Sequence, residues 1–153
     1  MEILCPRPIS NGMKLLGKKL KMTQLWKGDV LEPVSVIQIH GGDDIAELKP
    51  GDSVKVSGIT KGRGWQGVVK RHGFHGGPTS HGAKNRIRAS GSIGNTSPQR
   101  VIPGRRMAGH MGAVRHTVLN LKVVDVVPGD KLVMIRGAVP GYNKRSVLEI
   151  VRK

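Results

Sequence analysis

Residues 117–135 read TVLNLKVVDVVPGDKLVMI, two apolar, β-branched runs separated by Pro-Gly-Asp. Proline presets the first corner of a tight turn, glycine supplies positive φ at the second, and aspartate can bond back to the backbone. The stretch therefore predicts two strands, Thr117–Val127 and Lys131–Ile135, joined by a turn. Residues 48–56, LKPGDSVKV, repeat the pattern and predict another turn that enters a strand.

Other segments also have the composition of strands. Residues 34–39 (VSVIQI) partly alternate, and Val147–Val151 is a short apolar run. Residues 12–26 (GMKLLGKKLKMTQLW) are interrupted by Gly-Lys-Lys, which predicts a strand, a basic turn and a second short strand. Gly-Gly-Asp-Asp at residues 41–44 predicts a turn. Short strands, Gly/Pro turns and no clear long helix predict a mainly β protein built as a small β-barrel.

The segment from Thr60 to Gly112 lacks sustained periodicity, and Gly, Ser, Pro, His and Arg dominate it. A structureless loop of this length is uncommon in an isolated compact domain, and so few apolar residues cannot offset the entropy of ordering it. We therefore expect this segment to become ordered on a partner. The predicted organisation is a β-barrel body of residues 1–59 and 117–153, with residues 60–116 as a long, irregular, basic extension inserted between strands.

Charge is distributed unevenly along the 153 residues, which carry 26 Lys+Arg against 10 Asp+Glu and a net charge of +16. No acidic residue lies between Asp52 and Asp125, and this window holds 13 Lys/Arg, 13 Gly and five of the six His. A solvated surface normally mixes signs, because uncompensated like charges repel, so this window favours a phosphate-lined environment. Aromatic residues make up only 3%, which favours structured RNA over single strands that stack on aromatic faces.

Several classes of protein are disfavoured by the same sequence. No apolar run approaches the roughly 20 residues that span a bilayer, and Met1–Gly12 lacks the charged start and apolar stretch of a secretory signal. Cys5 is the only cysteine, so an intrachain disulfide and a multi-cysteine zinc site are excluded, and a reducing compartment fits. We expect no cofactor, no metal ion, no membrane partner and no homo-oligomer.

Residues 60–67 (TKGRGWQG) contain the GxGxxG spacing of dinucleotide-binding loops. That fold would need a helix next, but residues 68–73 form a poor one in sequence, and no acidic residue follows about 20 positions on. Close approach of a phosphate to the glycine backbone, with charge from Lys61 and Arg63, is the favoured interpretation.

Three histidines, His72, His75 and His81, invite comparison with a metal site. Neither cysteine nor carboxylate is near them in sequence, and glycines flank them, so contact with phosphate is favoured over zinc. The segment also lacks the paired carboxylate that general acid–base catalysis usually recruits. A zinc site, a phosphate-handling enzyme and a free-standing RNA chaperone or nucleoid-type protein stay open as alternatives at this point.

The predicted RNA-binding set combines the basic side chains of the acid-free window with two lysines near the start of the chain. Arginine suits this role because it makes bidentate phosphate contacts and stacks on bases. The set is Lys18, Lys19, Lys61, Arg63, Lys70, Arg71, His72, His75, His81, Lys84, Arg86, Arg88, Arg100, Arg105, Arg106 and Arg115.

Five stretches, in order along the chain, resemble one known family. They are residues 16–23 (LGKKLKMT), 60–71 (TKGRGWQGVVKR), 91–94 (GSIG), 103–112 (PGRRMAGHMG) and 136–141 (RGAVPG). On these residues the chain is similar to ribosomal protein L-three of the large subunit, in its bacterial or organellar form.

The resemblance implies a translation-type β-barrel and a central loop that penetrates large-subunit rRNA toward the peptidyl-transferase centre. It also implies a non-catalytic, structural protein of the cytoplasmic ribosome, or of an organellar one, that acts early in subunit assembly and contacts neighbouring ribosomal proteins. The loop tip then falls near residues 92–100. The residues expected close to the peptidyl-transferase centre are Ser92, Gly94, Asn95, Thr96 and Ser97.

The chain departs from the family pattern in places. Only residues 40–60 stand where family members usually carry a long stretch, which implies a shortened barrel region. Lys21 replaces a common glycine, and Lys55 stands where an acidic or amide residue is usual. Some bacterial members carry a methylated glutamine before the loop-tip proline, whereas here Ser97 precedes Pro98.

Overall fold

The computed structural model describes residues 13–152, which form two compact units. The first, which we call the body, contains the residues up to Lys61 and from Val114 onward, and the second, the insert, is Gly62–Ala113. The predictions for Met1–Gly12, including Cys5, lie outside the described residues.

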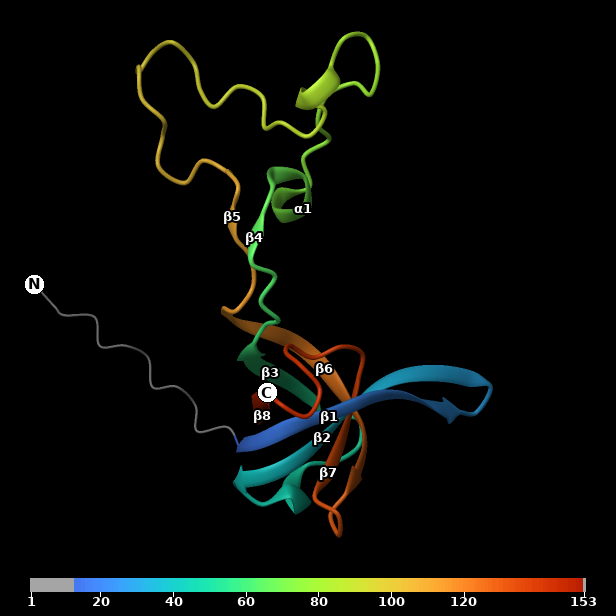
Figure 1. The fold of residues 1–153 in the computed structure, drawn as a ribbon. Coiled ribbons are helices and arrows are strands. Elements are labelled where there is room, and N and C mark those ends of the chain that lie inside the picture. Colours follow the sequence, from blue (N-terminus) through green and yellow to red (C-terminus); the bar gives the residue numbers. More distant parts are fainter. Residues whose placement is uncertain (1–12, 153) are drawn as a thin grey trace, which may run out of the picture. The chain divides into compact units, whose positions relative to one another are not determined.

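The body is an antiparallel β-barrel (Figure 1). Its strands follow the order β1-β2-β7-β6-β3-β8, and the pairing of β8 with β1 closes the circle. A short 3-10 turn, Ile45–Glu47, lies between β2 and β3 and is capped by Asp44. The prediction of a mainly β protein built on a small barrel is therefore confirmed. The strands are β1 (Lys14–Lys27), β2 (Val30–Gly42), β3 (Ser53–Ile59), β6 (Arg115–Val127), β7 (Leu132–Arg136) and β8 (Val147–Arg152).

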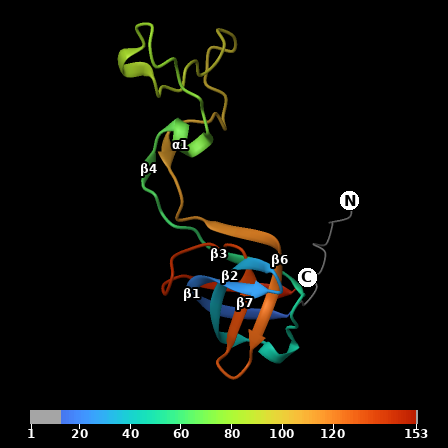
Figure 2. The ribbon, with the colours of Figure 1, turned by 90° about the vertical axis from the view of Figure 1, so that its right-hand side faces the viewer.

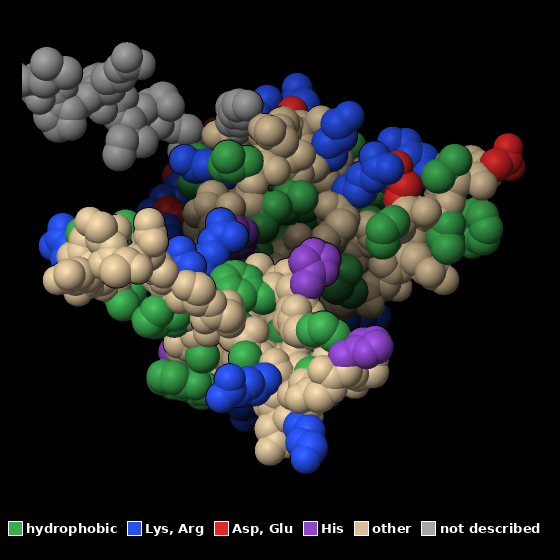
Figure 3. Space-filling view, turned by 90° about the horizontal axis from the view of Figure 1, so that it is seen from above, with side chains coloured by type: hydrophobic (Ala, Val, Ile, Leu, Met, Phe, Trp, Pro, Cys, Tyr) green, Lys and Arg blue, Asp and Glu red, His purple; other side chains and the backbone are tan. Residues whose placement is uncertain are grey.

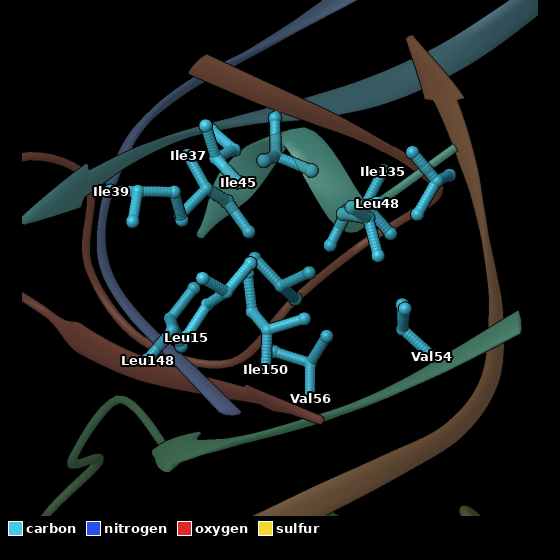
Figure 4. Packing of buried hydrophobic residues seen from close by; sticks show 13 residues of the cluster. Leu15, Ile37, Ile39, Ile45, Leu48, Val54, Val56, Ile135, Leu148 and Ile150 are labelled. Carbon is cyan, nitrogen blue, oxygen red and sulfur yellow. The ribbon is translucent and has the colours of Figure 1, made fainter. Parts of the chain in front are cut away.

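Aliphatic side chains from the barrel strands fill its interior (Figure 4). Alternate residues of a strand face opposite sides of the sheet, so β-branched runs such as that of β8 place every second side chain inside. Leu15, Ile37, Val54, Ile135 and Ile150 are at most 1% exposed. This packed interior holds the strands in fixed positions, and with them the outer surface and the loops of the barrel.

The Pro-Gly-Asp turns lie where the sequence predicts them. In the first, the Asp52 carboxylate accepts a hydrogen bond from the Lys49 N–H at 3.0 Å, and Gly51 has φ +95°. The second joins β6 to β7, but there the positive φ falls on Lys131, at 53°, and not on the glycine. Both turns lead directly into strands, which confirms the prediction for each.

The prediction of a basic turn within residues 12–26 is wrong, because β1 is continuous through Gly17 and Lys19. Register shifts in its pairing with β2 absorb the irregularity at two points, Leu16/Gly17 and Lys19/Lys21. A Cβ at residue 17 would lie 2.6 Å from the Ile37 side chain, so glycine is needed here for packing and not for a turn. Similarly, the predicted turn glycines 41 and 42 belong to β2.

The first two strands continue beyond their other partners as a hairpin (Figure 1). β8 pairs with β1 only over Lys14–Lys18, and β7 pairs with β2 only over Val34–Gln38. Near the hairpin tip, Trp26 is 73% exposed. No helix in the described part of the chain is long and apolar enough to cross a membrane.

Candidate nucleic-acid interface

The insert begins and ends with a small antiparallel pair, β4 (Trp65–Gln66) and β5 (Gly109–His110). The Arg63 N–H donates to the Met111 carbonyl at 2.8 Å, and the Met111 N–H donates to the Gly64 carbonyl at 3.0 Å. These bonds continue the pairing beyond the Trp65–His110 pair, before the start of β4 and past the end of β5. The two ends of the insert are therefore held together by its own backbone.

A single helical turn, α1 (Val68–His72), follows β4 (Figure 2). The prediction of a poor helix at these residues is corrected: Gly67 is the N-cap and Gly73 ends the turn at φ 74°. A helix of five residues cannot be predicted from hydrophobic periodicity, because it contains little more than one helical repeat of about 3.6 residues. The basic residues of α1 lie in its last turn, where the carbonyl end of a helix favours positive charge.

The helix is tied to the returning chain through the Met107 carbonyl. Arg71 Nη1 donates to this oxygen at 2.7 Å, and His72 Nε2 lies 3.1 Å from it. A Cβ at residue 109 would stand 2.6 Å from Arg71 Nη1, so the glycine there lets the guanidinium pass. Two predicted RNA-binding residues thus also hold the insert together, and both are only half-exposed.

Very little of the insert is buried. Val68, at 5% exposure, is its one buried hydrophobic side chain. The prediction that the segment lacks a substantial apolar core is confirmed, although the segment is folded locally and is not structureless. Its conformation depends on turns and backbone hydrogen bonds, which leaves polar side chains and peptide groups at the surface.

The insert carries nine Lys/Arg and four His without a single Asp or Glu. All four ion pairs of the described residues lie in the body, where they join Lys14 and Arg115 to Glu149, Arg136 to Glu32 and Arg152 to Asp52. Figure 3 shows Lys, Arg and His side chains standing at the surface, with hydrophobic side chains and tan backbone and other side chains between them. The cations of the insert therefore have no carboxylate partner of their own.

Most predicted RNA-binding residues of the insert are exposed. At the predicted loop tip, Arg105 Nη2 donates to the Ser92 carbonyl at 2.7 Å, which joins the two sides of that loop. The exposed predicted residues are Arg63, Lys70, His75, His81, Lys84, Arg86, Arg88, Arg100, Arg105 and Arg106, and in the tip Ser92, Gly94, Asn95, Thr96 and Ser97.

Lys19 requires a correction, because its side chain is buried in the body and cannot serve as a surface phosphate contact. Its Nζ donates to the Val139 carbonyl at 2.9 Å and lies 3.5 Å from that of Gly141. Burial, assisted by the charge of Lys61, lowers the pKa of the Lys19 ammonium below its ordinary value. This lysine anchors the loop between β7 and β8 to β1.

The other predicted residues of the body differ in their surroundings. Lys18 is half-exposed on β1, and the Lys61 Nζ lies 5.3 Å from the centre of the Tyr142 ring. Arg115 pairs with Glu149, a carboxylate that lies outside the acid-free window in sequence. Hydrogen bonds from Lys14 and Arg115 hold the pKa of the Glu149 carboxyl below its usual value. Arg115 is consequently less available to a phosphate than the cations of the insert.

The structure bears on the alternative of a metal site. Within residues 13–152, no group of three or more His, Cys, Asp or Glu side chains could hold a metal ion.

A hollow in the insert is lined by Phe74 together with several of the predicted RNA-binding residues. Phe74 cannot be recognised as a site residue from the sequence, because nothing in its spacing marks it and only the folded loop brings it together with basic residues.

A small antiparallel barrel with a long, irregular, carboxylate-free basic insert defines a class of β-barrel proteins suited to a polyanionic partner. Within that class, the family described as Ribosomal protein L3 matches residues 43–131. The chain belongs to the ribosomal protein L3 family.

Relatives in several bacteria carry the name large ribosomal subunit protein uL3. The protein of Chlorobaculum tepidum is 52% identical over 152 residues, which cover 95% of this chain and 69% of the relative. That of Chloroherpeton thalassium is 50% identical over 117 residues, 74% of this chain and 56% of the relative. That of Desulforapulum autotrophicum is 55% identical over 101 residues, which cover 65% of this chain and 48% of the relative. The chain thus spans about half to two thirds of the length of these relatives.

Family membership answers two of the questions left by the sequence. The resemblance to the ribosomal family is confirmed, as is the prediction of a protein that is not an enzyme, since the relatives are ribosomal proteins. The relatives' names place them in the large ribosomal subunit, in line with the predicted location in a ribosome.

Proposed function

We propose that the chain is a structural constituent of the large ribosomal subunit and binds large-subunit rRNA chiefly through its insert. The observation that carries the proposal is the set of nine Lys/Arg in the insert without a carboxylate among them. Such a surface repels itself when free, and it is neutralised when phosphates lie against it.

The mechanism is charge neutralisation at places where rRNA helices converge. Guanidinium groups make bidentate contacts with phosphates, and glycine lets the backbone approach closely enough for its N–H groups to donate. Each phosphate contact releases counterions, which makes binding steeply dependent on salt. A double helix of RNA hides its base edges in a deep, narrow groove, so shape dominates recognition over most of this surface.

The finer parts of the proposal rest on the family resemblance. They are that the chain acts early in subunit assembly, contacts neighbouring ribosomal proteins and works in the cytoplasmic ribosome as one copy. The loop tip at residues 92–97 lies, in this proposal, near the peptidyl-transferase centre. The exposure of the tip and its tie to Arg105 support a role as a contact element.

A salt titration tests the proposal with transcribed large-subunit rRNA, for example that of Chlorobaculum tepidum. We expect one defined footprint and a steep salt dependence. Replacing Lys84, Arg88 and Arg100 together by glutamine should make the negative slope of log K against log salt shallower by up to about 2–3, at roughly 0.7–0.9 per phosphate contact.

The matched control is Arg136→Gln, which removes a cation already paired with Glu32 in the body. It should leave the slope close to that of the wild type. Weak protection spread over many sites would instead indicate a free-standing RNA chaperone. An unchanged slope in the triple variant would contradict the role of the insert.

A further inference from the structure

The insert contains a hollow of about 600 Å³. This volume lies within the range of small-molecule sites, roughly 300–1,000 Å³. Its lining residues include one phenylalanine, two arginines, two histidines and four glycines. The side chains that matter here are His72, Phe74, His75, Arg86 and Arg106.

Backbone contacts fix the shape of the hollow. The Gly77 N–H donates to the Ile87 carbonyl at 2.8 Å, which holds the loop after α1 against the segment that follows the 3-10 turn Lys84–Arg86. Gly76 has φ +80°, and a Cβ there would stand 2.2 Å from the Ile87 carbonyl oxygen. Only glycine permits this approach, so the hollow is a defined feature of the insert.

The His72 side of the aromatic wall is also held in place. The His72 ring, bound to the Met107 carbonyl, lies 6.1 Å from the Phe74 ring at an interplanar angle of 45°. Phe74 is the only phenylalanine of the chain and is half-exposed. Part of the Phe74 residue is open to solvent where it lines the hollow, so a ligand placed there can contact an aromatic side chain.

The charge of the hollow selects the class of ligand. Within the described residues, the guanidinium groups of Arg86 and Arg106 make neither a hydrogen bond nor an ion pair, and the insert supplies no carboxylate to repel an anion. A hollow lined by a phenylalanine and by two arginines without ion-pair partners suits a ligand that is both aromatic and anionic. Unpaired nucleotides of RNA have this chemistry, since their bases stack on aromatic side chains and their phosphates pair with arginine.

We propose that this hollow receives one unstacked nucleotide of large-subunit rRNA, with its base against Phe74 and His72 and its phosphate on Arg86 and Arg106. The inference rests on the proposed function and deepens it: most of the insert contacts the RNA backbone, whereas this site holds a base. It gives the otherwise shape-driven interface one point that depends on a nucleotide being unpaired and extruded.

The test uses chemical probing and affinity measurements on the transcribed large-subunit rRNA with the full chain. Wild type and Phe74→Tyr, which keeps the ring, should alter the reactivity of the same unpaired nucleotide. Phe74→Leu should abolish that change and weaken binding about tenfold, a typical effect of losing one base–aromatic stack. The salt slope should stay unchanged, because no charge is removed.

The matched control is Trp65→Leu, which removes an aromatic side chain that is 76% exposed and does not line the hollow. It should leave the reactivity of that nucleotide as in wild type. Thermal unfolding of each variant establishes that the comparison is made between folded proteins, and Phe74→Tyr keeps the test decisive if Phe74→Leu is unstable.

The two proposals fail in distinguishable ways. If Phe74→Leu binds within twofold of wild type with an identical footprint, the nucleotide site is wrong while the proposed function stands. If wild type does not bind the rRNA, the proposed function fails as well. Micromolar binding of free AMP that Phe74→Leu removes would overturn the assignment to RNA in favour of a free nucleotide.

Discussion

Gly42, at the end of β2, offers a sharp test of how closely β1 and β2 approach each other. It pairs with Leu15 of β1 and has φ +109°. A Cβ at this position would lie 2.2 Å from the Lys14 carbonyl oxygen and 2.8 Å from the Leu15 Cα. Both obstacles are backbone atoms, so a side-chain rotation cannot relieve the contact.

The cost of Gly42→Ala has two parts. Holding alanine at strongly positive φ costs about 1–3 kcal/mol. Displacing the neighbouring strand backbone adds roughly 1–3 kcal/mol, as in other overpacked sites. We therefore expect Gly42→Ala to lower the free energy of unfolding by about 2–6 kcal/mol. Gly51→Ala is the matched control, because Gly51 has φ +95° with nothing within 4 Å of a built Cβ, so only the first part applies.

Urea and thermal unfolding, followed by far-UV circular dichroism, measure the difference between the two variants. Each kcal/mol corresponds to a shift of roughly 4–8 °C in the midpoint for a domain of about 100 residues, the size of the body. We expect Gly42→Ala to unfold well below Gly51→Ala. Equal stability of the two variants would refute the close approach of β1 and β2 at this point.

Three further substitutions probe the body. Glu149→Gln removes the shared partner of Lys14 and Arg115 and should lower the free energy of unfolding by about 0.5–2 kcal/mol at neutral pH. The pKa of Glu149 is lower in the folded than in the unfolded protein. The stabilisation by this carboxylate is therefore fully present above the unfolded pKa and is lost as the pH falls through the folded pKa. Burial lowers the pKa of Lys19 in the folded protein, so wild type should become more stable as the pH rises from that folded pKa toward the unfolded value of 10.5. Lys19→Met should lack this gain in stability. Urea unfolding from pH 7 upward measures the difference. Ile150→Ala, at 1% exposure, should cost about 2–5 kcal/mol in the same assay.

Each of these predictions has its own counter-result. A Glu149→Gln penalty that is the same at pH 3 as at pH 7 would contradict the ion pairs. Parallel stability curves of wild type and Lys19→Met in alkaline solution would contradict the burial of that ammonium. For Ile150→Ala the control is Val147→Ala on the same strand, 65% exposed, which should change stability by less than about 0.5 kcal/mol.

Sequence reasoning succeeded where local chemistry decides the structure. The Pro-Gly-Asp motifs mark both turns, although in the second the positive φ falls on Lys131, and the alternating runs beside them have the period of a strand. The exclusion of acidic residues was visible without any structure. These features sufficed for the barrel and for a basic insert between its strands.

Contacts between distant segments decided the rest. Gly17 resembles a turn residue until the Ile37 side chain of another strand is placed against it. Lys19 resembles a surface cation, yet its partners Val139 and Gly141 lie about 120 residues away along the chain. Glu149 reaches Arg115 across the sheet, so an acid-free stretch of sequence is not an acid-free surface. The short helix α1 is held by capping and by Met107, which leave no periodic signal.

Sedimentation of the chain in native lysate tests the central claim most directly. At low salt the protein should travel with the large ribosomal subunit in a sucrose gradient, and rising salt should release it as phosphate contacts are lost. Recovery only in the free fractions at low salt, with none in large subunits, would contradict the account.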